Sequence, residues 1–280
     1  MKRFFALAAL VLGLAACQTE PEGLDVNVGG EQLVTVNVTV PEAETRAANS
    51  GIGVFDNGVL DGAATMRYIF QVFYKGNESE AERMVKYSDG KSVAFDVRLV
   101  PDREYTFVVW ADVVTAENAG DNHYDTSDLT KIKLNDTWNA MDETRDAFTT
   151  TATRTYNGSM DLTLKLTRPF AKLRVVTTDI QSLTNLGIVP TKATVIYKTG
   201  YRDTFNAVEG KAAAATTNKK EHTNFAIASY GESNTGDAYT LFTDYFFAEA
   251  GDVVKFDFDV LDQDNKSIKA NSFGTEISVK

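Results

Sequence analysis

The stretch LVTVNVTV, residues 33–40, alternates valine with threonine and asparagine and decides the fold class. In an extended strand Val34, Val36, Val38 and Val40 all lie on one face, and the polar residues lie on the other. A two-residue period is typical of a β-strand with one buried face and one solvated face. The pattern therefore predicts a strand whose four valines enter a hydrophobic core.

Similar patterns recur along the rest of the chain. Strands are expected at residues 66–74, 92–99, 105–114, 161–167, 173–177, 194–197, 239–247 and 253–260. Helical pieces are expected to be short, at residues 126–134, 139–148 and 181–186, and residues 211–220 are expected to form an exposed loop or a short helix. Short strands separated by turn residues predict an all-β chain, mainly β with short helices, built from β-sandwiches.

Length and composition limit the architecture and the partners. The 280 residues are enough for two domains, and the boundary is expected near Arg168, where one alternating strand ends and another begins. A net charge of −11 argues against a nucleic-acid partner, because phosphate binding needs clustered lysine and arginine. A single cysteine excludes an intrachain disulfide framework and a cysteine-rich zinc site.

The N-terminus has the composition of a targeting segment. Residues 1–16 combine a basic start with an apolar run that is too short for a bilayer, which takes roughly 20 residues. The sequence LAAC at residues 14–17 resembles the lipobox of bacterial lipoproteins, which implies cleavage before Cys17, acylation of Cys17 (a palmitate-type modification) and transport to the outer membrane. The alternative is a plain secretory signal with an incidental cysteine. Residues 17–30 are polar and acidic and are expected to form a tether between lipid and fold.

Five segments occur in an order that is similar to the fimbrillin-like surface lipoproteins of Bacteroidales. They are PEAETRA at residues 41–47, VWAD at 109–112, YDT at 124–126, RDAF at 145–148 and LTRPFAKLR at 166–174. The chain most resembles an uncharacterised subgroup of that family, a domain-of-unknown-function family. The resemblance implies two tandem transthyretin-like β-sandwich domains, at residues 31–167 and 168–280. It also implies a structural or adhesive role in a pilus.

The resemblance implies a processing event as well. In polymerising members an arginine-specific protease cuts in the loop after the first strand, and a strand from another subunit fills the open groove. The cut would fall between Arg46 and Ala47, in a stretch with the composition of an exposed loop. Loss of four buried valines would remove about 6–12 kcal/mol of stabilisation by apolar burial, at roughly 1.5–3 kcal/mol for each valine. The groove left open would favour addition of a strand from another chain. The alternative is that Arg46 is an ordinary loop arginine and the first strand stays in place. Residues 275–280 form only a short alternating tail, a truncated donor strand at most.

Other candidate sites are weaker. Residues 121–128 are rich in oxygen ligands but lack the EF-hand pattern, so a solvated loop and no metal site is expected. Asp257 and Asp259 are likewise expected to face water. Trp110, in an apolar strand, is expected in the core, whereas Trp138 has polar neighbours, is expected to be more exposed, and is the candidate contact for a ligand such as a glycan.

No catalytic residue or cofactor is predicted, because no nucleophile elbow and no phosphate-binding loop occurs in the sequence. A hydrolase with an unrecognised pair of carboxylates is the enzymatic alternative. The main prediction is a non-enzymatic, lipid-anchored protein of the cell outer membrane that takes part in fimbriae and cell adhesion. Its expected partners are the outer membrane, other fimbrial subunits and a host glycan or protein. The alternative is an unprocessed, monomeric surface lipoprotein that binds a glycan or a partner protein.

Overall fold

The chain folds as an all-β protein. The structure is a computed structural model of all 280 residues. It describes residues 30–40, 64–74, 77–135, 138–140, 142–216, 220–227, 231–235, 238–268 and 273–279. Among these residues there is one short α-helix, α1 (Ile180–Asn185), and one 3-10 turn, η1 (Glu143–Arg145). No helix in the described part of the chain is long and apolar enough to span a bilayer.

The first lobe consists of two sheets packed face to face. One has the strand order β4 (Ser92–Leu99), β1 (Gln32–Thr39), β9 (Leu162–Lys165). The other has the order β3 (Asn77–Ser88), β2 (Thr65–Tyr74), β5 (Arg103–Val114), β8 (Ala147–Tyr156). Their inward side chains form one hydrophobic core that includes Phe70, Phe95 and Phe107, with the Phe70 and Phe95 rings stacked 4.9 Å apart. This arrangement is a β-sandwich.

The second lobe has the same two-layer plan. One sheet has the order β10 (Phe170–Thr177), β16 (Ala238–Phe247), β15 (Gly231–Thr235). The other has the order β14 (Lys220–Ala226), β11 (Pro190–Thr199), β17 (Val253–Asp262), β18 (Phe273–Ser278). Tyr197, Phe242 and Phe256 belong to the core between them. Trp138 and Ala140, which precede β8 in the sequence, pack against this second core.

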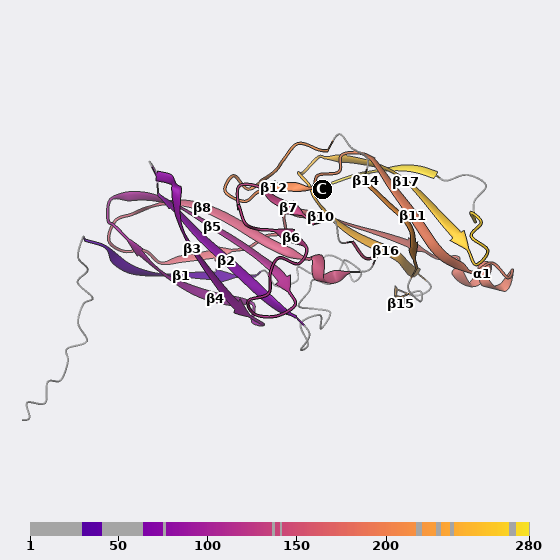
Figure 1. Cartoon of the computed structure of the whole chain (residues 1–280), viewed down its shortest axis with the longest axis horizontal. Helices are drawn as coiled ribbons and strands as arrows, with labels where there is room; N and C mark the ends of the chain where they lie inside the picture. The colour runs from indigo at the N-terminus through magenta and orange to yellow at the C-terminus, as the bar shows by residue number, and fades with distance from the viewer. Residues whose placement is uncertain are drawn as a thin grey trace, which may run out of the picture.

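A small sheet lies where the two lobes meet (Figure 1). Its order is β13 (Lys211–Ala212), β12 (Thr204–Asn206), β7 (Ile132–Leu134), β6 (Tyr124–Asp125). It therefore joins strands from both halves of the sequence. Trp110, fully buried, contacts Tyr124 at 5.2 Å and Phe247 at 6.3 Å between ring centroids. The junction is thus a third hydrophobic core, as expected for Trp110. The predicted division into domains at residues 167 and 168 stays a prediction.

The structure confirms the expected strands and corrects two of the predicted helices. Residues 126–134 were expected to be helical but form turns that lead into β7. The reason is local, because Asp125 and Asp128 each accept a hydrogen bond from the backbone N–H two residues later. Residues 139–148 contain only η1 before β8 begins at Ala147, whereas helix α1 forms where a helix was expected. Strand β13 and irregular chain occupy residues 211–216.

The turn after β11 gives a first test of the packing between β11 and β17. Gly200 has φ +82°, and a Cβ there would lie 2.4 Å from the Val253 carbonyl oxygen. We expect Gly200→Ala to lower the free energy of unfolding by roughly 1–3 kcal/mol, measured by urea titration. Gly251→Ala is the matched control, because Gly251 has φ +90° but nothing within 4 Å of its Cβ position. Equal losses in the two variants would contradict the clash.

Candidate strand-exchange site

Strand β1 occupies the middle of its sheet. It runs antiparallel to β4, from the pair Gln32–Leu99 to the pair Thr39–Ser92. On its other side it runs parallel to β9, from the pair Val36–Leu162 onward. Residues 36–39 of β1 are thus paired on both edges, so departure of the strand would leave the edges of β4 and β9 unpaired at once.

The inward face of β1 supplies its apolar contacts. Val34, Val36, Val38 and Val40 are 5%, 0%, 0% and 4% exposed and belong to the first core. Burial of each valine contributes roughly 1.5–3 kcal/mol, so the four together contribute about 6–12 kcal/mol. The predicted buried face of the strand is therefore the face that the core contacts.

The outward face of β1 is open to solvent. Thr35 and Asn37 are exposed, and Leu33 is 53% exposed. The Thr35 hydroxyl donates a hydrogen bond of 2.6 Å to the Asp96 carboxylate. Strand β1 is thus held by its backbone ladders and by one row of apolar side chains, with little side-chain contact above it.

The C-terminal end of the strand is fixed on both sides. The Val40 N–H donates to the Lys91 carbonyl at 2.8 Å, and the Leu166 N–H donates to the Thr39 carbonyl at 2.9 Å. The chain between Val40 and Ala64 joins β1 to β2, and both Arg46 and Ala47 fall in it, outside the described residues. Cys17 also lies outside the described residues. Lipidation and cleavage therefore stay predictions.

Trp138 is half-buried and thus more exposed than the fully buried Trp110, as expected, but its ring has internal partners. Its indole N–H donates a hydrogen bond of 2.8 Å to Asp244, and its ring stacks on His222 with centroids 3.9 Å apart. The polar residues around it in the sequence do not reveal these contacts, because the partners lie about a hundred residues later. A ligand contact at Trp138 stays a prediction, and a ligand would have to use a ring that already packs internally.

Asp244 is the centre of a buried polar cluster, which we call the Asp244 cluster. Its carboxylate is fully buried. It accepts hydrogen bonds from Trp138 (2.8 Å), Arg145 (3.1 Å), Tyr197 (2.7 Å) and the Tyr245 N–H (2.8 Å). Because Trp138 and Arg145 come from the segment between β7 and β8, the cluster ties that segment to the second lobe.

The charge of Asp244 is stabilised in spite of its burial. Burial alone would raise the pKa of this carboxyl, but its interactions with His222, Arg145 and Tyr197 outweigh burial and hold the pKa below its ordinary value. The His222 Nε2 lies 3.6 Å from the carboxylate. Sequence reasoning missed this cluster. The one available signal was an aspartate inside the apolar strand at residues 239–247.

The oxygen-rich loop at residues 121–128 is organised by an ion pair and turns. Asp121 lies 2.8 Å from the buried Arg67 guanidinium and accepts hydrogen bonds from the Thr126 backbone and hydroxyl. Arg67 also pairs with the fully buried Asp112 at 2.7 Å. Within the described ranges no three histidine, cysteine, aspartate or glutamate side chains are grouped to hold a metal ion. Asp121 is exposed, as expected for a solvated loop, and its ion pair with Arg67 ties the loop to the first lobe.

His123 contacts a hydroxyl and a carboxylate through one ring nitrogen. The His123 Nε2 is 2.7 Å from the Thr144 hydroxyl and 3.6 Å from the Asp142 carboxylate, so both neighbours meet the same ring nitrogen. A catalytic triad needs the carboxylate on the opposite nitrogen, and burial lowers the pKa of His123. The arrangement fits a structural histidine better than a general base.

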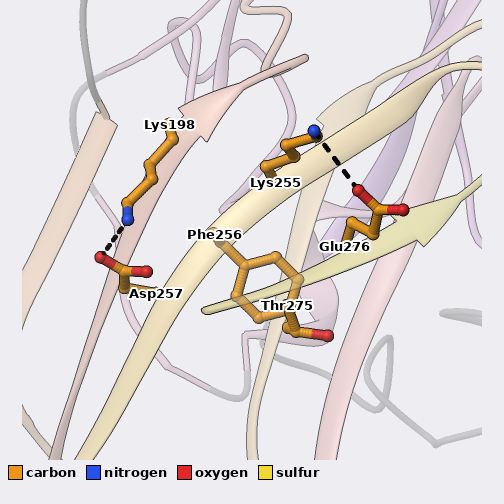
Figure 2. Close-up of a pocket in the computed structure, with 6 residues that line it drawn as sticks. All are labelled: Lys198, Lys255, Phe256, Asp257, Thr275 and Glu276. Atoms are coloured by element: carbon orange, nitrogen blue, oxygen red, sulfur yellow. Dashed lines mark ion pairs between the residues drawn. The ribbon is translucent and has the colours of Figure 1, made fainter. Parts of the chain in front are cut away.

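A shallow hollow lies on the outer surface of β11, β17 and β18 (Figure 2). Its volume is about 270 Å³, below the range of roughly 300–1,000 Å³ that is usual for small-molecule sites. Lys198 faces Asp257 at 2.6 Å and Lys255 faces Glu276 at 3.4 Å across neighbouring strands. Since these charges neutralise one another, the hollow offers little to an ionic ligand.

The chain matches one protein family over most of its length. A family model described as "Family of unknown function (DUF6562)" matches residues 26–280. The chain belongs to this family. No curated protein matches it. Among solved structures, the chain is similar to the fimbrial anchor protein Mfa2 from Porphyromonas gingivalis, with 14% identity and a TM-score of 0.46 over 87% of this chain and 82% of that one. A similarity at this level carries no argument about function.

Proposed function

We propose that this DUF6562 protein is a structural or adhesive subunit of fimbriae, without catalytic activity, that accepts a strand of another subunit in place of β1. The observation that carries the proposal is the place of β1, a central strand with four buried valines. Such a strand leaves behind a long apolar groove between two open edges, which a β-strand of another chain fits well.

In this proposal the chain is delivered to the outer membrane as a lipoprotein. Lipid on Cys17 holds it there, because each buried CH₂ of an acyl chain contributes about 0.8 kcal/mol. Residues 17–30 form the tether to two domains, residues 31–167 and 168–280. An arginine-specific protease then cuts between Arg46 and Ala47, so that β1 is no longer joined to β2.

We assign the chain the accepting role in this exchange. Strand β18 pairs antiparallel with β17 from Val253–Ser278 to Phe258–Phe273. Ile277 of β18 packs against the second core. The C-terminal tail that was considered as a truncated donor is therefore engaged in its own sheet, and giving it up would uncover the second core.

The test is the intact mass and N-terminus of the protein recovered from native outer membranes. We expect an unlipidated chain that begins at Ala47, and we expect the Arg46→Lys variant, which keeps the charge but resists an arginine-specific protease, to retain lipid at Cys17. A native chain that keeps both the lipid and an intact Arg46 would overturn the proposal. The protein would then be an unprocessed surface lipoprotein, and the search would turn to a glycan or protein ligand.

A further inference from the structure

Strand β1 begins at a buried hydroxyl group. The Tyr156 hydroxyl donates a hydrogen bond of 2.5 Å to the side-chain oxygen of Gln32, the first residue of β1. Tyr156 is the last residue of β8 and is 2% exposed. The side chain of Gln32 lies on the same face of the strand as Val34, since residues two apart share a face. Gln32 itself is exposed, so this hydrogen bond lies at the rim of the core, ahead of the row of four buried valines.

Tyr156 is held in place independently of β1. It pairs with Arg103 in the β5–β8 ladder, and its carbonyl oxygen accepts a hydrogen bond of 2.6 Å from the Asp102 N–H. Its ring belongs to the first core. A strand that takes the place of β1 therefore meets the same hydroxyl, and one that offers it no acceptor forgoes this hydrogen bond.

The valines alone fix the register of a strand poorly. A slip of one residue turns every valine outward, but a slip of two residues keeps the alternation and loses only one of the four contacts. A polar group at one end of the groove removes this ambiguity, because among the registers that keep the valines inward only one brings an acceptor to the Tyr156 hydroxyl.

We propose that Tyr156 is a specificity-determining residue of the strand-exchange site. It selects strands that carry a side-chain acceptor, an amide or a carboxylate, two positions before the first of the alternating apolar residues. This inference rests on the proposed function and names the chemistry of the partner strand.

The test uses the full chain with a specific protease site placed at Arg46–Ala47 and then cut. Labelled peptides of residues 31–40 compete with the resident β1, and their binding is followed by fluorescence anisotropy. We expect Gln32→Met, a similar shape without a comparable acceptor, to bind about tenfold more weakly than the native peptide, and Gln32→Glu to bind nearly as well. Asn37→Ala, which changes an exposed position, is the matched control and should bind like the native peptide.

The Tyr156→Phe chain separates a hydrogen bond from simple packing. On this chain the native and Gln32→Met peptides should bind equally, because the hydroxyl that distinguishes them is gone. If the Tyr156→Phe chain does not fold, the peptide series on the native chain decides alone. Discrimination against Gln32→Met that persists on the Tyr156→Phe chain, or equal binding of all peptides to the native chain, would overturn the inference but not the exchange. Failure of every peptide to displace β1 would overturn the proposed function as well.

Discussion

A chain that begins at Ala47 is expected to lose the monomeric native state. It lacks β1, so the first core loses four buried valines, about 6–12 kcal/mol of apolar burial. That amount is comparable with the whole net stability of a typical domain, about 5–15 kcal/mol. The edges of β4 and β9 also become unpaired. We expect oligomers in light scattering and loss of the near-UV circular dichroism signal.

Addition of a peptide of residues 31–40 should restore the monomer, because it supplies the missing row of valines and both backbone ladders. The matched control is a chain that begins at Gly30, which keeps β1 and should fold as a monomer without any peptide. If the Ala47 chain unfolded at the same urea concentration as the Gly30 chain, β1 would not be the part that completes the first core.

Asp244→Asn is expected to destabilise the fold strongly, although it leaves side-chain size unchanged. It leaves the Arg145 guanidinium, whose side chain is 3% exposed, without its carboxylate partner. Removal of one partner of a buried ion pair lowers the free energy of unfolding by about 3–5 kcal/mol. The control is Asp257→Asn, which breaks a partly exposed pair with Lys198 and should lower the free energy of unfolding by less than about 1 kcal/mol. Urea unfolding of both variants gives the comparison.

Two further measurements identify the cause of that loss. Arg145→Met combined with Asp244→Asn should lower the free energy of unfolding less than Asp244→Asn alone, because no buried charge is then left unpaired.

The destabilisation by Asp244→Asn should also depend on pH. The folded pKa of Asp244 is below its ordinary value, so its contribution is present above the unfolded pKa of about 3.9 and is lost as pH falls through the folded pKa. The difference in free energy of unfolding between the native chain and the Asp244→Asn variant should be constant from neutral pH to about pH 5 and should vanish at lower pH. A gap that widened in acid would contradict this assignment.

The sequence predicted local structure well where one face of a strand is buried. The alternation in residues 33–40 revealed β1 and its inward face, since a period of two is a direct consequence of strand geometry. It could not show that β1 is a central strand, because the choice of β4 and β9 as neighbours depends on residues far along the chain. Strand β3 escaped notice because its charged sequence, NESEAERMVKYS, lacks an apolar period.

The polar contacts of the site were the least predictable part. Gln32 and Tyr156 lie 124 residues apart in the sequence, and nothing in either neighbourhood indicates the other. Trp138 was interpreted from its polar neighbours, whereas its environment is set by Asp244 and His222. Side-chain pairs of this kind follow from the tertiary fold, so local composition carries no information about them.

The parallel pairing of β1 with β9 has a consequence for the timing of folding. Strand β1 is among the first parts of the fold to be synthesised, yet Val36 can pair with Leu162 only after most of the first lobe has followed. Contacts that close such long loops form slowly. Until Leu162 has been synthesised, the edge of β1 that later faces β9 has no partner strand, and another extended segment can pair with it. The order of synthesis therefore sets how long β1 lacks its parallel partner.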